Sequence, residues 1–293
     1  MAFNVETFKT RALSAVVFVA VMMVGLLWNH WSFLVLFSII HFGCWVEYHK
    51  IMGLINPDFN NITPTQRYGF MVAGWAFMLS MTNNAFVLKG TRMSGLGLLL
   101  MLVCGIVLPL FLVVLRKSYS VKNLGISAMG LLYISLPWAL MIGIRSHGLI
   151  SSGSTVLMDT GMVIPLVLIA SIWINDTMAY IVGSFIGKTP FSSISPKKTW
   201  EGTAGGAILC VLAVTLGGYY IFKIEDITSL VVISAIAAIF GTAGDLFESK
   251  LKRMAGLKDS GQIMPGHGGF LDRFDSLLLA TPFVWLYTWM FNV

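Results

Sequence analysis

Charged residues are scarce in this sequence. Asp, Glu, Lys and Arg make up 11% of its 293 residues, whereas soluble domains carry about a quarter. Hydrophobic residues account for 57% of the chain, and its mean hydropathy is +0.82. This composition excludes an ordinary water-soluble domain. We therefore expect an integral membrane protein, and we expect no nucleic-acid partner.

Cysteine is equally sparse. Cys44, Cys104 and Cys210 stand singly within apolar runs and lack metal-ligand spacing, which excludes a disulfide framework and a structural zinc site. The sequence also lacks internal repeats and low-complexity stretches. The first apolar run starts near Ala12 and continues without a small-residue cleavage site, so it is interpreted as a retained helix and not as a signal peptide.

Long hydrophobic runs are what the chain has in abundance. A membrane-crossing helix needs roughly 20 apolar residues, and nine runs approach that length. They lie near 12–28, 31–48, 68–82, 94–115, 124–144, 161–186, 203–222, 228–244 and 276–292. The predicted fold class is therefore all-α: a polytopic membrane protein with about nine transmembrane helices.

The distribution of positive charge predicts the orientation. With nine spans and a cytoplasmic N-terminus, fifteen of the nineteen Lys and Arg residues fall on the cytoplasmic side and four on the other. We divide the chain into N-terminal transmembrane helices that serve as a lipid-facing scaffold (1–150) and C-terminal helices that carry cytoplasmic catalytic loops (151–293). Both parts belong to one continuous membrane domain.

An acid lies within the sixth apolar run. Asn175 and Asp176 occur about ten residues inside it, and a carboxylate there is costly unless it faces protein, water or a ligand. Asp176, Tyr180, Gly183 and Gly187 share one helix face, and the two glycines would let another helix approach closely. A role in binding substrate or metal competes here with that of a buried hydrogen-bond acceptor.

A basic stretch follows on the same predicted side. The sequence SPKKTWEG brings Ser195 and the adjacent cations Lys197 and Lys198 to the point where the chain re-enters the membrane. A lone lysine pair at a membrane surface is typical of a topology anchor. Its proximity to further charged residues makes phosphate binding the alternative.

Most of the remaining charge is gathered between the last two apolar runs. If the eighth helix continues beyond the membrane, Asp245, Glu248, Ser249 and Lys252 share one face. That stripe is either a solvated surface or part of a site. A glycine-rich stretch with Gly268 and Gly269 follows, and its bare backbone amides suit phosphate oxygens.

The chain then re-enters the membrane with FLDRFDS, which places Asp272, Asp275 and Ser276 on one helix face. Carboxylates brought together from two helix ends repel each other unless a cation lies between them. Magnesium suits that position because it takes hard oxygen ligands and is commonly completed by substrate phosphates. His267 lacks the partners of a hydrolytic triad. These residues favour phosphoryl or nucleotidyl transfer. Asp275, three residues from Asp272 and equally acidic, is taken as the control for substitutions of Asp272.

The stretch SKLKRMAGLKDSGQIMPGHGGFLDRFD, residues 249–275, resembles the signature of the phosphatidate cytidylyltransferases, or CDP-diacylglycerol synthases. WINDTMAY, SPKKTWEG and GDLFESK also resemble that family, so the specific similarity covers 173–276. The resemblance implies a reaction of CTP with phosphatidic acid that gives CDP-diacylglycerol and pyrophosphate, with magnesium held by Asp245 and Asp272. A second cation and a homodimer stay open. It also implies a bacterial inner-membrane enzyme with a cytoplasmic active site.

The expected site divides into two sets of residues. The catalytic set is Asp245, Asp272, Lys252, Arg253, Lys258, Asp259 and His267. The substrate-binding set is Asn175, Asp176, Ser195, Lys197, Lys198, Glu248, Ser249, Gly268, Gly269 and Arg273. Another CTP-dependent lipid enzyme and an ion-coupled transporter are the alternatives. The concentration of charge in cytoplasmic loops, and not along a transmembrane path, disfavours the transporter.

Overall fold

The computed structural model describes residues 5–115, 120–147, 149–151, 157–192, 194–262 and 268–292. It is almost entirely helical within these ranges, and each of the nine predicted apolar runs coincides with a helix or a continuous helical segment. Six helical segments of the described chain are long and apolar enough to cross a membrane. The protein is therefore an all-α polytopic membrane protein, as predicted. The count of nine spans and the side of the N-terminus stay predictions.

The chain divides into two compact units. Unit 1 comprises Met1–Ser146 with Met254–Arg273, and unit 2 comprises His147–Arg253 with Phe274–Val293. The segment between the last two helices thus belongs with the first half of the sequence, whereas most of α10 and α11 belongs with the second half.

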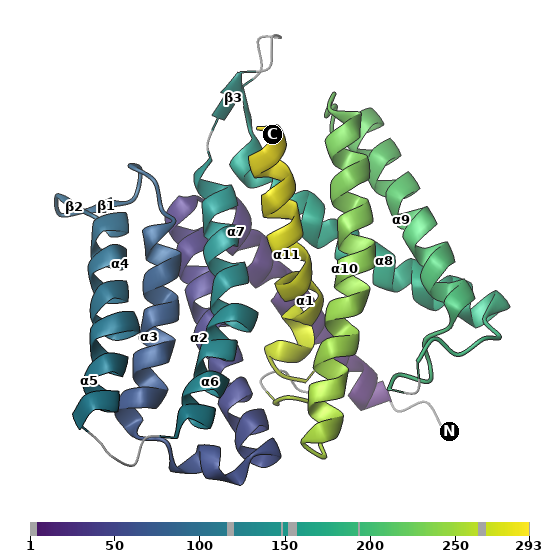
Figure 1. The fold of residues 1–293 in the computed structure, drawn as a ribbon. Helices are drawn as coiled ribbons and strands as arrows, with labels where there is room; N and C mark the ends of the chain where they lie inside the picture. The colour runs from purple at the N-terminus through teal and green to yellow at the C-terminus, as the bar shows by residue number, and fades with distance from the viewer. Residues whose placement is uncertain are drawn as a thin grey trace. The chain divides into compact units, whose positions relative to one another are not determined.

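Unit 1 is a group of antiparallel helices joined by short loops (Figure 1). Its elements are α1 (Val5–Leu27), α2 (His30–Ile55), η1 (Pro57–Asn61), α3 (Pro64–Ser80), β1 (Val87–Leu88), β2 (Thr91–Arg92), α4 (Met93–Met101), η2 (Leu102–Val107), α5 (Leu108–Leu115), α6 (Val121–Gly130), η3 (Leu131–Ser135) and α7 (Leu136–Ser146). The π-helical turns η2 and η3 link α4 to α5 and α6 to α7 within continuous helical segments. The strands β1 and β2 form a small antiparallel hairpin.

Helix α2 supplies much of the buried interior of unit 1. Phe37, Cys44 and Trp45 are inaccessible to solvent. His41 and Ser135 are also buried, and their side chains meet at 3.0 Å, with the Trp45 indole donating to both. A buried polar group is tolerated where it has a hydrogen-bond partner. These contacts tie α2 to η3.

Unit 2 contains four long helices and a short hairpin. They are β3 (Leu149–Ser151), β4 (Leu157–Asp159), α8 (Thr160–Ile186), α9 (Trp200–Tyr220), α10 (Ile227–Met254) and α11 (Leu271–Phe291). Helices α8 and α9 pack closely, because a Cβ at Gly202 would lie 2.9 Å from the Cα of Gly183, and one at Gly206 would lie 2.7 Å from the backbone of Ala179. The predicted close approach of a helix at Gly183 is confirmed.

Helices α10 and α11 also pack against each other. Phe240 stacks on Phe283 with ring centroids 3.6 Å apart, and the hydroxyls of Ser229 and Tyr287 lie 2.9 Å apart. A side chain at Gly244 would collide with the backbone of Asp275. Helix α10 runs on to Met254, so the predicted extension of the eighth helix beyond its apolar run is confirmed.

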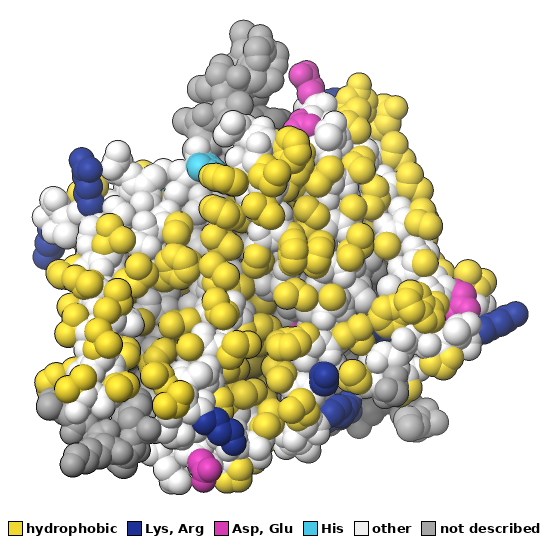
Figure 2. Space-filling view, viewed as in Figure 1, with side chains coloured by type: hydrophobic (Ala, Val, Ile, Leu, Met, Phe, Trp, Pro, Cys, Tyr) yellow, Lys and Arg dark blue, Asp and Glu magenta, His cyan; other side chains and the backbone are white. Residues whose placement is uncertain are grey.

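The outer faces of both units are rich in exposed hydrophobic side chains (Figure 2). In unit 1 they cover the segment from α4 to α5, where Leu98, Val103 and Leu110 are exposed. In unit 2 they line α9, where Ile208 and Leu212 are exposed. A soluble protein rarely exposes apolar surface of this extent, and hydrocarbon is the environment that suits it.

Candidate active site

A cavity of about 480 Å³ opens in unit 2 among α8, α9, α10 and the α8–α9 loop (residues 187–199, described apart from 193). It is lined by Asn175, Asp176, Ala179, Tyr180, Gly183, Ser184, Ser195, Lys197, Lys198, Thr199, Thr203, Thr242 and Asp245. Six of these residues were predicted from the sequence as site residues, from three separate motifs. The fold therefore gathers those motifs around one cavity.

Helix α8 forms one wall of this cavity. Asp176 and Tyr180 are one turn apart on it and are both exposed to the cavity, whereas Asn175 is almost fully buried. The predicted shared face of Asp176, Tyr180 and Gly183 lines the cavity, but Gly187 does not and instead packs against Thr199. An acid inside an apolar helix is thus accommodated because it opens onto this cavity.

The α8–α9 loop is held in a defined shape by backbone bonds. Pro190 pairs with Thr199 in a bridge, Phe191 N donates to Lys198 O at 2.7 Å, and Trp200 N donates to Thr189 O at 3.0 Å. Thr199 then caps α9 by accepting from Gly202 N at 3.1 Å. This geometry fixes the backbone that carries the two lysines.

Glu201, in the first turn of α9, holds the other arm of the same loop. Its carboxylate accepts from Lys188 N at 3.2 Å, Thr189 N at 3.1 Å and the Thr189 hydroxyl at 2.8 Å. A carboxylate in the first turn of a helix is also favoured by the helix dipole. Glu201 therefore stabilises the loop and does not line the cavity.

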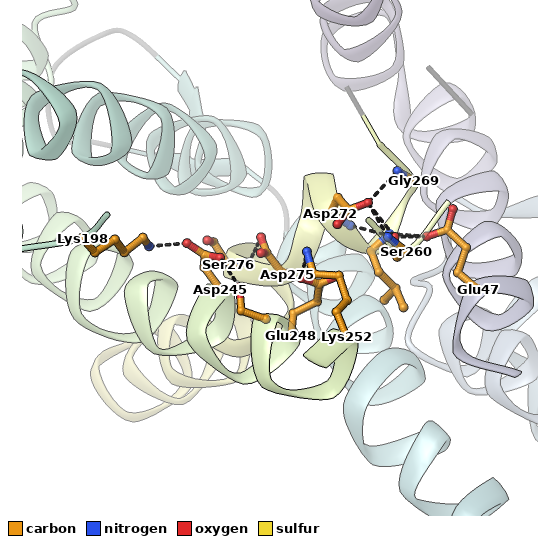
Figure 3. Close-up of polar contacts among 12 residues, drawn as sticks. Glu47, Lys198, Asp245, Glu248, Lys252, Ser260, Gly269, Asp272, Asp275 and Ser276 are labelled. Carbon is orange, nitrogen blue, oxygen red and sulfur yellow. Dashed lines mark hydrogen bonds and ion pairs between the residues drawn. The ribbon is translucent and has the colours of Figure 1, made fainter. Parts of the chain in front are cut away.

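Lys198 and Asp245 form an ion pair across the cavity (Figure 3). Each side chain keeps a little over a quarter of its surface exposed, at 28% and 29%. Asp245 also accepts from the Ser249 hydroxyl at 3.3 Å, one turn further along α10. A phosphate could compete for Lys198, and a cation could compete for Asp245.

A second ion pair lies deeper in unit 2. Glu248 and Lys252, one helical turn apart on α10, are paired and buried. Asp275 on α11 is buried as well, and the charges of Asp245, Glu248 and Lys252 all act on it (Figure 3). Asp275 is therefore a member of this charged cluster. It does not serve as the acidic control for Asp272 that its sequence position indicated.

In unit 1, Asp272 organises the signature loop, which we define as residues 255–270 between α10 and α11 (described apart from 263–267). One oxygen, Oδ2, accepts from Ser260 N, the Ser260 hydroxyl and Gly269 N, each at 2.8 Å. The amide of Gly269, which we expected to face phosphate, thus bonds to Asp272. Gly268 adopts a φ of +82°, which glycine reaches without steric cost.

Glu47 on α2 is the residue of this region that the sequence analysis missed. It is buried, and it accepts hydrogen bonds from Phe270 N, Leu271 N and the Ser260 hydroxyl (Figure 3). A lone acid in an apolar run was the available signal. Nothing in the local sequence indicated a partner more than 200 residues away.

The other predicted residues are spread over both units. Arg253 in unit 2 and Lys258, Asp259 and Arg273 in unit 1 are exposed. His267 lies outside the described residues. Of the two proposed metal ligands, Asp245 belongs to unit 2 and Asp272 belongs to unit 1.

The oxygen donors present are compatible with magnesium. Among the described residues, no three His, Cys, Asp or Glu side chains converge to hold a metal ion on their own. Magnesium does not need such a set, because it typically takes one or two carboxylates and completes its shell with water and substrate phosphates. Asp245, partly exposed at the cavity, provides a carboxylate of this kind.

Comparison with known proteins identifies the family. Residues 9–291 match the cytidylyltransferase family, and the chain belongs to it. It is 32% identical over 230 residues to phosphatidate cytidylyltransferase 4, chloroplastic, of Arabidopsis thaliana, an alignment that spans 78% of this chain and 53% of that protein.

Two bacterial relatives are also similar. The phosphatidate cytidylyltransferase of Bacillus subtilis is 32% identical over 219 residues, covering 74% of this chain and 76% of the relative. That of Synechocystis is 43% identical over 129 residues, covering 44% of each chain. The alignments thus span about half of the Arabidopsis and Synechocystis proteins and three quarters of the Bacillus protein.

Proposed function

We propose that this protein is a phosphatidate cytidylyltransferase: it transfers the CMP part of CTP to phosphatidic acid and gives CDP-diacylglycerol and pyrophosphate. The observation that carries the proposal is the cavity of unit 2. In a chain of the cytidylyltransferase family, that cavity combines Lys197, Lys198 and Asp245 with the polar side chains of Asn175 and Asp176.

The reaction needs no nucleophile from the protein. An oxygen of the phosphatidate phosphate attacks the α-phosphorus of CTP, and the bond from that phosphorus to the pyrophosphate oxygen breaks. Both reactants are anions, so the protein has to hold them in line and neutralise the charge that develops on the leaving group. Lys197 and Lys198 supply positive charge at the cavity for this purpose. Lys252 and Arg253 follow on α10 as further candidates.

The acids of the site are proposed to hold a cation and to position the lysines. Asp245 and Asp272 are the proposed magnesium ligands, and a bound magnesium ion would neutralise charge on the phosphates of CTP. Asp245 in its ion pair also keeps Lys198 directed into the cavity. Asp176, exposed to the same cavity, is a candidate for contacts to the sugar or to a lipid headgroup. Whether a second cation takes part, and whether the protein is a homodimer, stay outside the proposal.

We place the reaction at the cytoplasmic face of a bacterial inner membrane. The support is the fifteen-to-four division of Lys and Arg in the nine-span topology and the presence of bacterial relatives. CTP is a cytosolic nucleotide, while phosphatidate arrives through the bilayer. A cavity lined by helices of membrane-crossing length and by a loop beside them suits access from both sides, the cytosol and the bilayer.

The test is a transfer assay with two labels. Purified protein is incubated with phosphatidate, magnesium and CTP labelled with ³²P at either the α or the γ position. Label from the α position is expected in the lipid fraction and label from the γ position in pyrophosphate. Transfer of γ label to lipid would reveal a lipid kinase, and no label in lipid with either nucleotide would refute the proposal. Lys223 is an exposed lysine of unit 2 outside the cavity. The variant Lys223→Gln is therefore the control for loss of one positive charge when variants of the cavity lysines are compared in this assay.

A further inference from the structure

Glu47 is a charged residue in an unfavourable place. It lies in α2, a 26-residue helix apolar enough to cross a membrane, and only 8% of its surface is exposed. Burying a carboxylate is unfavourable unless hydrogen bonds compensate for its lost hydration. Phe270 N and Leu271 N donate to Glu47 at 2.8 Å each, and the Ser260 hydroxyl, which Glu47 shares with Asp272, lies 2.7 Å from it.

The two amide donors lie together at the start of α11. Leu271 is the first residue of α11, and Phe270 precedes it. The first amides of a helix have no partner within the helix, and the positive end of the helix dipole lies there. Glu47 therefore caps α11 from a different helix, and its negative charge matches that dipole end.

Glycines make room for this carboxylate. A Cβ at Gly261 or at Gly269 would overlap Glu47 Oε1, and one at Gly43, one turn before Glu47 on α2, would overlap the Phe270 ring. Three backbone positions, two in the signature loop and one on the facing helix, thus exclude a side chain. This gives Gly261 and Gly269 a structural reason that is separate from phosphate binding.

Glu47 is also connected to Asp272. The Ser260 hydroxyl lies 2.7 Å from Glu47 Oε2 and 2.8 Å from Asp272 Oδ2, so a single hydroxyl lies between the two carboxylates. Asp272 in turn accepts from Ser260 N and Gly269 N. Residue 260 of the signature loop and residues 269–272, where the loop passes into α11, are held together by this one cluster (Figure 3).

We propose that Glu47 is a positioning residue for the transfer reaction. It touches neither reactant in this role. It fixes Ser260 and Phe270 of the signature loop and the start of α11, and thereby the orientation of Asp272. This inference rests on the proposed function and adds to it that the first half of the chain contributes a residue on which the geometry of the site depends.

The experiment compares Glu47→Gln with Gly261→Ala. Gln keeps the size of the side chain but loses its charge and turns one NH₂ toward backbone donors. Gly261→Ala pushes a methyl group against the same carboxylate and changes no charge. Both are expected to lower kcat by about 10²-fold, the effect of misplacing a site group by roughly an ångström, with a change in KM for CTP below about threefold. The double variant is expected to lose no more than either single variant, since one contact is involved.

Amide hydrogen exchange supplies a readout that is independent of activity. Peptides that contain Phe270 and Leu271 are expected to exchange at least about tenfold faster in both variants, while peptides from α9 stay unchanged. His41→Asn is the control for a general loss of stability, because His41 is buried on the same helix but bonds to Ser135 and Trp45. Gly125→Ala, where a Cβ meets nothing within 4 Å, is the control for the glycine substitution.

Each outcome decides the matter. Wild-type kcat in Glu47→Gln, or unchanged exchange at Phe270 and Leu271, overturns the proposal. So does a loss of activity that follows the fall in melting temperature equally in Glu47→Gln and His41→Asn, because Glu47 would then only stabilise the fold. If the wild-type protein transfers no CMP at all, the proposed function fails, and the exchange data alone still show whether Glu47 orders the loop.

Discussion

Replacing Lys198 by Gln tests the cavity of unit 2 most directly. Lys198 lines the cavity and is paired with Asp245, with 28% of its side chain exposed. If it binds a phosphate in the transition state, the variant loses one hydrogen bond between charged groups, which is worth about 1.5 to 3 kcal/mol. Asp245 also loses its partner, which costs about 0.5 to 1 kcal/mol of folding stability for a pair this open to solvent and does not enter kcat/KM.

The lost bond, about 1.5 to 3 kcal/mol, corresponds to a fall in kcat/KM for CTP of roughly 10- to 150-fold. The assay is the transfer of α-label from CTP to phosphatidate, measured over a range of CTP concentrations. Lys198→Arg keeps the charge and is expected to recover part of the loss, although its planar fork presents the charge differently.

Lys188→Gln is the matched control for this experiment. Lys188 is an exposed lysine on the same loop that does not line the cavity. It is expected to stay within about threefold of wild type, since it contributes only to the general surface potential. A Lys198→Gln variant within threefold of wild type, or an equal loss in Lys188→Gln, would show that the lysines act as topology anchors.

Three further predictions concern the acids and the topology. Asp245→Asn and Asp272→Asn should each lower turnover by at least about 10²-fold and raise the magnesium concentration needed for half-maximal rate; unchanged magnesium curves in both would contradict the ligand assignment. Glu201→Ala removes the acceptor of the Lys188 and Thr189 amides and should raise the KM for CTP several-fold while speeding proteolysis of the α8–α9 loop, whereas an intact loop with normal KM would argue against its anchoring role. In a background without the native cysteines, Cys introduced at Gln262 and at Lys223 should react with an impermeant reagent from opposite sides of sealed vesicles, and labelling of both from one side would refute the nine-span topology.

The helices could be predicted because their signal is strong and local. An apolar run of membrane-crossing length has few alternatives to a helix, since the backbone must satisfy its hydrogen bonds internally in hydrocarbon. The predicted runs therefore coincide with helices. The π-helical turns at 102–107 and 131–135 could not be predicted, because one extra residue in an apolar helix leaves the hydrophobic pattern unchanged.

The cavity residues could be predicted for a related reason. A polar or charged residue in an apolar chain is conspicuous. Lys198 and Asp245 stood near the boundary of a membrane run, and Asp176 lay about ten residues inside one. The helices then had to bring those positions together. What the spacing could not reveal is which acids bond to which groups. Asp275 is three residues from Asp272, yet it joins the buried cluster of Glu248 and Lys252.

Glu47 marks the limit of local inference. Its partners lie more than 200 residues further along the chain, and they are backbone amides, which every residue but proline possesses. A buried acid that binds backbone amides has no complementary sequence motif. The one local trace is Gly43, one turn earlier on the same face of α2, where the Phe270 ring fits.

The described acids differ in what they bind, and this decides how each substitution will express itself. Glu47 and Glu201 accept backbone amides, so their removal releases a loop and alters geometry. Asp245 and Glu248 pair with lysines, so their removal leaves a cation without its partner. The first kind of loss should depend little on magnesium and show in hydrogen exchange. Loss of Asp245 should also change the response to magnesium and to salt, because screening acts on charges exposed at the cavity, whereas Glu248 is buried. The chain has only thirteen acids, and those described here either hold loops in place or pair with lysines. Kinetics combined with hydrogen exchange can distinguish these two roles residue by residue.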